Sequence, residues 1–337
     1  MNSAARSASP ARWLLVPLGI LAGACMTLQA RVNSALTAFT HDAALSATFS
    51  FAGGWLALAL AMALQPRARQ RLRDGFSAVA RGTFPWWLGL GGLSGAFYVF
   101  TQGAAVPAVG IAIFTIAYVA AQTAGSFLWD HIGLGPSGPH QLSVNRVAGA
   151  LLAVVAVTVA VSSAHAVTPT ASWVVLLPVI AGIGASWQQA ANGRVRVELG
   201  SVLATTFWNF TVGTAALLVA SGVRAVSMPW HIAPGSEWWM WCGGPIGIVF
   251  IATAAAIVRR VGVLLLSLLL TLGQLSSALV ITALTPSLPP VELGSVLGTA
   301  ICIAAVAVML IPSRAKLRHL VERNRDGNAG VERLGRR

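Results

Sequence analysis

Charged side chains are scarce in this sequence. Asp, Glu, Lys and Arg make up only 9% of the 337 residues, and hydrophobic residues make up 56%. Soluble domains carry about 25% charged residues. The mean hydropathy of +0.75 agrees with this shortage of charge. The composition excludes an ordinary soluble domain and predicts an integral membrane protein.

Several chemical signatures are also missing. The three cysteines, Cys25, Cys242 and Cys302, stand apart in apolar runs, so neither a metal site nor a disulfide framework is indicated. The sequence holds no nucleophile–His–acid set and no paired carboxylates within the apolar runs. A phosphate-cradling Gly-x-x-x-x-Gly-Lys loop is absent as well. We therefore expect no enzyme activity, no cofactor, no metal and no direct use of ATP.

Long apolar runs dominate the chain instead. A membrane-spanning helix needs about 20 apolar residues, and ten runs approach that length. We expect an all-α membrane protein with ten transmembrane helices, near residues 13–37, 45–64, 84–104, 110–129, 146–164, 173–191, 201–222, 238–258, 261–284 and 293–312. Between them we expect a solvated inner loop at Pro66–Thr83 and a tight outer turn at Val106–Gly110.

The basic residues are distributed unevenly. The net charge is +13, and if the amino terminus is cytoplasmic, all 22 Lys and Arg except Arg31 and Arg224 fall on the inner side. This is the positive-inside pattern, which predicts that both termini are cytoplasmic. The basic charge then faces anionic lipid, and we expect no nucleic-acid partner.

The second half of the chain repeats the first. Gly23, Gln29 and Asn33 recur 159 positions later as Gly182, Gln188 and Asn192. After the inner loop the offset falls to 152. Further equivalent pairs are Phe51 and Phe210, Gly54 and Gly213, Trp86 and Trp238, Trp87 and Trp239, Gly91 and Gly243, Gly92 and Gly244, Gly95 and Gly247, Gly110 and Gly262, and Gln122 and Gln274. One internal duplication thus spans most of the chain.

Each half contains five expected spans, an odd number. A second copy therefore enters the membrane from the opposite side, which gives two inverted five-helix repeats of the kind that many transporters use for alternating access. The expected organisation is a disordered cytoplasmic tail at 1–12, a first five-helix repeat at 13–165, an outer linker at 166–172, a second five-helix repeat at 173–312 and a basic cytoplasmic tail at 313–337.

These motifs resemble the YdcZ-like inner-membrane exporters of the drug/metabolite transporter (DMT) superfamily, whose members have five spans and about half this length. The first half also carries Pro107, Asp130 with Gly133, and Arg146 with Gly149, which match the family pattern. The second half departs from it, with Arg259 at the position of Pro107 and Thr282 at that of Asp130. The resemblance implies a multi-pass transporter of the bacterial inner membrane, with no reaction chemistry and no settled substrate.

Amide side chains form the best candidate site, because Gln29 and Asn33, like Gln188 and Asn192, share one face of a helix at a spacing of four. Buried amides need hydrogen-bond partners. They either line a substrate path or only join helices. The full set of path candidates is Gln29, Asn33, Gln122, Gln188, Asn192 and Gln274, with Tyr118 and Ser126 beside Gln122.

Two charged residues are candidates for coupling transport to an ion or proton gradient. Arg31 lies within the first expected span and could contact an anion, or extend its guanidinium to the interface. Asp130 follows Gln122 and Ser126 at helical spacing and could exchange protons, or anchor the helix end.

The leading hypothesis is a secondary transporter that exports a small polar or amphipathic metabolite. The alternative is a membrane scaffold or sensor that moves nothing. The partners expected are a small-molecule substrate and lipid. Since five-span relatives need to pair whereas a fused chain can act alone, both a monomer and a homodimer stay open.

Overall fold

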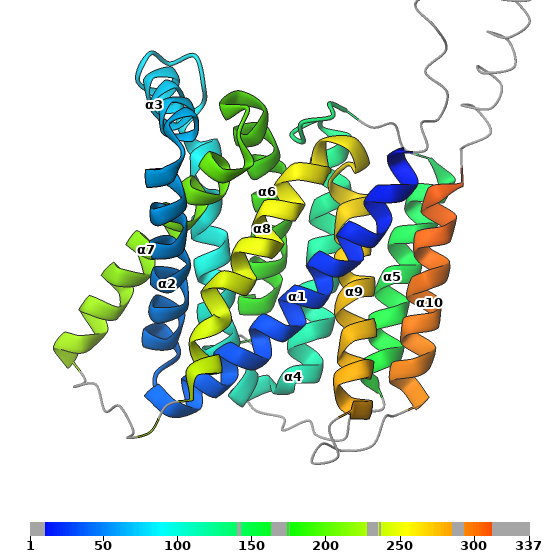
Figure 1. Ribbon diagram of the computed structural model, residues 1–337. Coiled ribbons are helices and arrows are strands. Elements are labelled where there is room, and N and C mark those ends of the chain that lie inside the picture. Colours follow the sequence, from blue (N-terminus) through cyan, green and yellow to red (C-terminus); the bar gives the residue numbers. More distant parts are fainter. Residues whose placement is uncertain are drawn as a thin grey trace, which may run out of the picture.

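The computed structural model describes residues 11–139, 143–162, 174, 176–227, 235, 237–284 and 293–311, and this part of the chain is helical, without a strand. Figure 1 shows the helices packed side by side in one bundle. They are α1 (Ala11–Thr40), α2 (Ala43–Leu64), α3 (Pro66–Ala80), α4 (Gly91–His131), α5 (Val144–Ser162), α6 (Leu176–Leu199), α7 (Val202–Ser227), α8 (Gly243–Val261), α9 (Val263–Leu284) and α10 (Leu293–Leu310), with short 3₁₀ turns η1 (Trp86–Leu90) and η3 (Trp238–Cys242).

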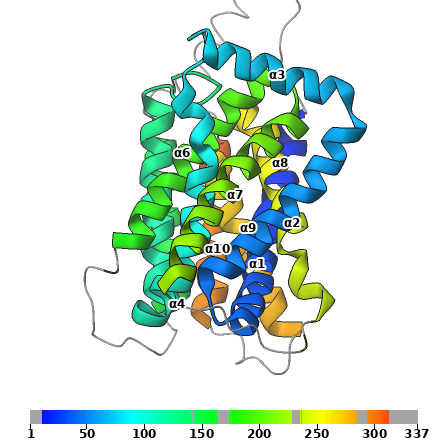
Figure 2. The same cartoon turned by 90° about the vertical axis from the view of Figure 1, so that its left-hand side faces the viewer.

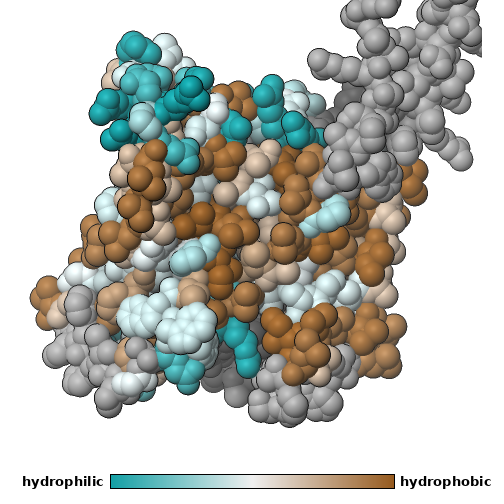
Figure 3. Space-filling view, in the orientation of Figure 1, coloured by the Kyte–Doolittle hydropathy of each residue, from teal (hydrophilic) through white to brown (hydrophobic). Residues whose placement is uncertain are grey.

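The bundle has the surface of a membrane protein. Figure 3 shows hydrophobic side chains over the middle of the molecule and hydrophilic ones gathered at one end, over α3. Five helices of the described chain are long and apolar enough to cross a bilayer, in α1, α2, α7, α8 and α9. Two shorter apolar helices lie at Val144–Val159 and Val296–Leu310. These findings establish an all-α membrane protein.

The expected inner loop at Pro66–Thr83 is wrong, because most of it forms the helix α3. Pro66 occupies the first turn of this helix, where its missing N–H costs nothing. Figure 2 shows α3 lying across the end of the bundle. Phe76 stacks on Trp208 of α7 with ring centroids 4.4 Å apart. The apolar side of an amphipathic helix thus packs on the bundle, and its arginines face outward.

The chain reverses within α4, and the tight outer turn expected at Val106–Gly110 lies inside this helix. Helical hydrogen bonding continues across Val106–Gly110. Tyr98 and Tyr118 would lie about 30 Å apart on a straight helix, yet their ring centroids are 4.6 Å apart. Pro107 lies between them and removes a backbone donor. The helix therefore doubles back, with one arm before Pro107 and one after it.

Equivalent residues of the two halves contact each other reciprocally where α2 packs on α7. The rings of Phe51 and Phe210 lie 5.2 Å apart. A Cβ placed on Gly54 would stand 2.4 Å from Cε1 of Phe210, and one on Gly213 would stand 2.5 Å from Cε1 of Phe51. Such self-complementary contacts are those that a two-fold axis produces. The axis relating the halves therefore passes close to the two phenylalanines.

The same reciprocity brings backbones together on either side of this pair. A Cβ on Gly92 would stand 2.1 Å from the carbonyl oxygen of Asn209, and one on Gly244 would stand 2.3 Å from that of Ser50. No other residue type fits at these two positions without moving a backbone. The glycine block shared by both halves thus sets how closely α4 approaches α7 and how closely α8 approaches α2.

One pair of equivalent helices, α1 and α6, runs in opposite directions. Figure 1 shows α1 beginning at the end of the bundle where α3 lies and running to the other end. Its counterpart α6 finishes at the α3 end, where Leu199 packs against Gly75. The two helices that carry the repeated amides are thus antiparallel.

Candidate functional site

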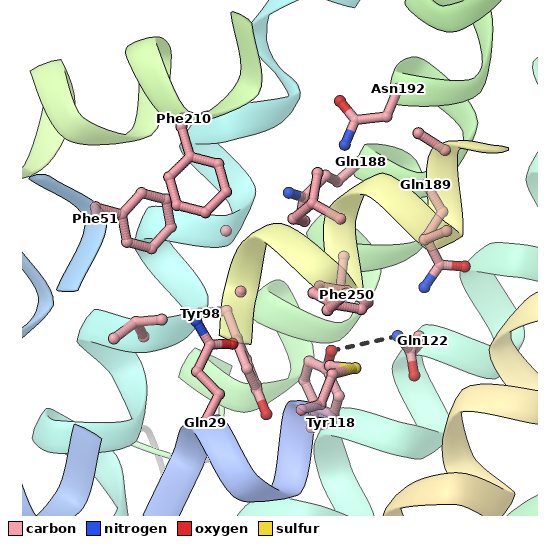
Figure 4. A pocket seen from close by; sticks show the side chains of 18 residues that line it. Gln29, Phe51, Tyr98, Tyr118, Gln122, Gln188, Gln189, Asn192, Phe210 and Phe250 are labelled. Carbon is pink, nitrogen blue, oxygen red and sulfur yellow. Dashed lines mark hydrogen bonds between the residues drawn. The ribbon is translucent and has the colours of Figure 1, made fainter. Parts of the chain in front are cut away.

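A cavity lies at the centre of the bundle, near the two phenylalanines. Helices α1, α2, α4, α6, α7 and α8 all contribute to its wall. Its volume is about 40 Å³, which holds about three water molecules. Figure 4 shows the side chains around it.

Many of the residues that line the cavity carry an amide or an aromatic ring, and none of the described lining residues is charged. The remainder is apolar or glycine. The lining comprises Gln29, Gln122, Gln188, Gln189, Asn192, Phe51, Tyr98, Tyr118, Phe210, Phe250, Met26, Gly95, Val99, Ala185, Gly247, Ile251, Ala254 and Ala255. The site can therefore hold a molecule by hydrogen bonds and ring contacts, without an ion pair among these residues.

Repeated residues occupy equivalent places in this wall. A Cβ on Gly247 would stand 2.4 Å from Nε2 of Gln29, and one on Gly95 would stand 3.0 Å from Nε2 of Gln188. Each glutamine thus lies against the glycine block of the opposite half. This is why the Gly–Gln–Asn motif and the Trp/Gly block occur together in both halves.

Two glutamines of the first half are held by their amide nitrogens. Gln29 donates from Nε2 to the carbonyl oxygen of Gly243 at 3.0 Å. Gln122 donates from Nε2 to the Tyr118 hydroxyl at 3.2 Å, which Figure 4 marks. Oε1 of Gln122 is buried and has no partner among the described residues. A buried polar atom without a partner lowers the stability of the fold.

Amides of the second half form a chain. Gln188 donates to Oδ1 of Asn209 over a long 3.4 Å, and Asn209 donates to Oδ1 of Asn192 at 3.0 Å. The position equivalent to Asn209 in the first half is Ser50, whose hydroxyl has no partner among the described residues. The two halves therefore differ in how firmly their amides are fixed.

Ser126 lies outside the cavity lining and is connected to it by hydrogen bonds. Its hydroxyl is 2.6 Å from that of Ser267, and Ser267 donates to Oε1 of Gln189 at 2.9 Å. This chain orients the amide of Gln189, which does line the cavity. Ser126 thus supports the site through α9.

Asn33 and Gln274 also lie outside the lining. Asn33 is 5% exposed, and its Oδ1 stands 2.3 Å from where a Cβ of Gly243 would be. Gln274 donates from Nε2 to Sδ of Met26 at 3.6 Å, and its carbonyl oxygen accepts from Thr27. Gln274 therefore joins α9 to α1, whereas Oδ1 of Asn33 is buried without a hydrogen-bond partner among the described residues.

The two charged candidates occupy different environments. Arg31 is exposed on α1. Asp130 is fully buried, at 0% exposure, and its carboxylate accepts from Arg146 at 2.5 Å. It also accepts from the backbone N–H groups of Val263 and Leu264 at 2.9 and 3.1 Å. Asp130 thereby caps the first turn of α9, outside the cavity lining.

Sequence reasoning did not place several lining residues. Phe51 and Phe210 marked the repeat, but nothing in the sequence indicated that they meet. Tyr98 and Phe250 are equivalent at the offset of 152, and this pairing could have been found. Gln189 gave no repeat signal, because the equivalent residue is Ala30.

An ion pair joins the halves at the end of the bundle away from α3. Arg224, at the end of α7, donates to the carboxylate of Asp42. Asp42 also caps α2, accepting from the N–H groups of Ala44 and Leu45 at 2.8 and 3.1 Å. Partial burial alone would raise the pKa of Asp42, but the bonds from Arg224 and the two N–H groups outweigh it and lower the pKa below its ordinary value.

Comparison with known proteins identifies the family. A family model described as "Putative inner membrane exporter, YdcZ" matches twice, at residues 14–159 and 173–308. A search of curated proteins found no match. One solved structure, described only as a crystal structure of a protein, shares the fold with a TM-score of 0.63 and 21% identity over 90% of this chain and 97% of its own. The chain therefore belongs to the YdcZ family of DMT inner-membrane exporters and contains two units of that family.

Proposed function

We propose that the protein is a secondary transporter of the bacterial inner membrane that exports a small polar or amphipathic metabolite by alternating access. The observation that carries this is the central cavity. Equivalent residues of both halves line it, among them Gln29 with Gln188 and Phe51 with Phe210. A site on the axis between two similar halves can be opened to either side by moving one half against the other.

The two repeats, 13–165 and 173–312, insert with opposite orientations in this proposal, and both termini lie in the cytoplasm. Support comes from the antiparallel course of α1 and α6. The positive-inside distribution of the basic residues supports the end that carries α3 as the cytoplasmic one.

Gln29, Tyr118, Gln122, Gln188 and Asn192 are the substrate-path residues of the proposal, since all five line the cavity. A scaffold or sensor would use the same amides only as links between helices. The shared cavity favours the transporter, because amides that only link helices need no open space between them.

Labelling of a single cysteine tests alternating access. Cys25, Cys242 and Cys302 are first replaced by alanine, and Ala185→Cys then places a thiol in the cavity wall. A membrane-impermeant maleimide is applied to right-side-out and to inverted vesicles. Alternating access predicts labelling from both sides.

The matched control is Ala153→Cys, at a fully buried position of α5 outside the cavity lining. It should be labelled from neither side. A cavity thiol that reacts from one side only, in vesicles where the control is protected, contradicts the proposed transport cycle and favours a static scaffold.

A further inference from the structure

Two arginines lie just beyond the central cavity, on the helix faces that line it. On α6 the lining residue Asn192 is followed four positions later by Arg196, and on α8 the lining residue Ala255 is followed four positions later by Arg259. Residues four apart share a face of a helix, and four residues advance the helix by about 6 Å. Each arginine therefore lies about one turn past the cavity, towards the α3 end of the bundle.

The two arginines are near each other because α6 and α8 pack together there. A Cβ on Gly193 of α6 would stand 2.7 Å from Cγ1 of Val258 of α8. Arg196 follows one turn after the first of these residues, and Arg259 comes directly after the second. Burial lowers the pKa of Arg196 below its ordinary value, and the positive charge of Arg259 lowers this pKa further. Two guanidinium groups thus act on each other electrostatically.

Neither guanidinium group has an anionic partner in the part of the chain that the structure describes. Arg196 is half-buried, and its Nε is enclosed without a hydrogen bond to a described residue. Glu198 also lies near the end of α6, but two residues correspond to about 200° around the helix, so it is on the opposite face from Arg196. Like charges held together are unfavourable, and an anion between them would remove the repulsion.

Asn192 adds a donor between the arginines and the cavity. It is 6% exposed, its Oδ1 accepts from Asn209, and its amide nitrogen donates to no described residue. That nitrogen keeps accessible surface, so a ligand can reach it. Figure 4 shows Asn192 at one end of the group of side chains, with Gln29 and Tyr118 at the other.

We propose that Arg196, Arg259 and Asn192 form an anion-binding site at the α3 end of the cavity, and that it takes a group with two negative charges, as in a phosphate monoester. A carboxylate has one charge and two oxygens, which a single guanidinium group satisfies in a bidentate pair. A phosphate monoester carries a charge of about −1.5 to −2 at pH 7 and offers three acceptor oxygens. It therefore matches two guanidinium groups and an amide N–H.

The substrate class follows if the protein is an exporter, so this step rests on the proposed function. The α3 end is the cytoplasmic end in that proposal, and an exporter receives its substrate from the cytoplasm. The protein has a net charge of +13, and Arg71 of α3 lies at the turn after α6, where a Cβ on Gly200 would stand 3.7 Å from its Cζ. A positive potential at this end attracts anions. The site thus binds a phosphorylated substrate before the substrate enters the cavity.

Three ligands with the same phosphate centre test the charge requirement. Methyl, dimethyl and trimethyl phosphate carry about two, one and no negative charges at pH 8. The full-length protein is placed in nanodiscs of phosphatidylcholine at constant ionic strength, and dissociation constants are measured from ligand-dependent thermal shifts. We expect methyl phosphate to bind about tenfold more tightly than dimethyl phosphate, and trimethyl phosphate to cause no shift. Equal shifts for all three compounds, or no shift with methyl phosphate, would overturn the inference.

Two glutamine variants connect the binding to the site. Arg259→Gln removes one of the two guanidinium groups and should weaken methyl phosphate binding about tenfold. The matched control is Arg260→Gln, which changes the net charge equally but lies about 100° further around α8 and is exposed. It should keep the wild-type affinity. Equal losses in both variants would assign the effect to the overall charge of this end and overturn the site.

Anionic lipid is a second source of phosphate, and nanodiscs that contain phosphatidylglycerol distinguish it. A soluble ligand predicts that methyl phosphate still shifts the melting temperature in these nanodiscs. If phosphatidylglycerol instead stabilises the wild type but not Arg259→Gln, and abolishes the shift by methyl phosphate, a lipid headgroup occupies the site. That result overturns the assignment to a substrate.

The labelling of Ala185→Cys separates this inference from the proposed function. Labelling from both sides without binding of methyl phosphate overturns the inference and leaves the transporter standing. Binding of methyl phosphate that depends on Arg259, together with labelling from one side only, leaves the anion site and overturns transport.

Discussion

Replacing Asp130 by alanine should destabilise the protein strongly. In the structure the carboxylate accepts from Arg146 at 2.5 Å and from the N–H groups of Val263 and Leu264 at 2.9 and 3.1 Å. The substitution leaves the Arg146 guanidinium, which is only 14% exposed, without this counter-ion. It also leaves the first turn of α9 without its cap.

The expected cost follows from these contacts. Removing one partner of a buried ion pair costs about 3–5 kcal/mol, and the lost cap belongs to the same network, so the two losses are not added. Asp130→Asn keeps an acceptor for the N–H groups, since Asn caps helices about as well as Asp. Only the charge is lost in Asp130→Asn. We therefore expect this variant to lose about half as much free energy of unfolding as Asp130→Ala.

Thermal unfolding in detergent, followed by circular dichroism, measures the effect. For a chain of this size the alanine variant should unfold about 5–10 °C below the wild type. The matched control is Asp74→Ala, because Asp74 is exposed on α3 and, among the residues that the structure describes, accepts only from Gln70. If Asp130→Ala unfolds within 1 °C of this control, Asp130 does not hold α9, and its role in proton coupling becomes the better hypothesis.

Two further outcomes are expected from stability measurements. Gly92→Ala should lower the free energy of unfolding by more than about 2 kcal/mol, because the new Cβ would stand 2.1 Å from the carbonyl oxygen of Asn209. The control is Gly53→Ala, where nothing lies within 4 Å of the new Cβ. It should leave the stability unchanged or raise it in the same assay. The lowered pKa of Asp42 means that its carboxylate is favoured in the folded state, so its contribution is present above about pH 4 and is lost as the pH falls through the lowered pKa. Melting curves recorded from pH 6 to pH 3 should show this loss of stability in the wild type and a smaller loss in Arg224→Gln. Equal losses of stability in the two proteins would contradict the assigned role of Arg224.

The duplication was the most informative part of the sequence. Identical spacing of Gly, Gln and Asn in both halves indicated that Gln29 and Gln188 hold equivalent positions, and both line the cavity. The reversal of the chain near Pro107 was also predictable, because Pro and Gly lie between two apolar runs. The continuous helical bonding through that reversal was not, since it depends on how the two arms of α4 pack.

Contacts between distant segments could not be predicted. Helical spacing placed Asp130 on one face with Gln122, but its partners at Val263 and Leu264 follow 133 and 134 residues later. Gln189 likewise lines the cavity, and its amide is oriented by Ser267 of α9, a contact that the sequence did not indicate. Tertiary packing therefore separated the residues that line the cavity from those that support it.

The opposite insertion of the two family units is tested most directly by reporter fusions within the full-length chain. Tags placed at residues 140 and 230 report which side of the membrane each position faces. Inverted repeats predict that position 140 lies in the cytoplasm and position 230 on the outer side. Finding both tags on the same side would contradict the antiparallel arrangement and, with it, the transport cycle proposed for the central cavity.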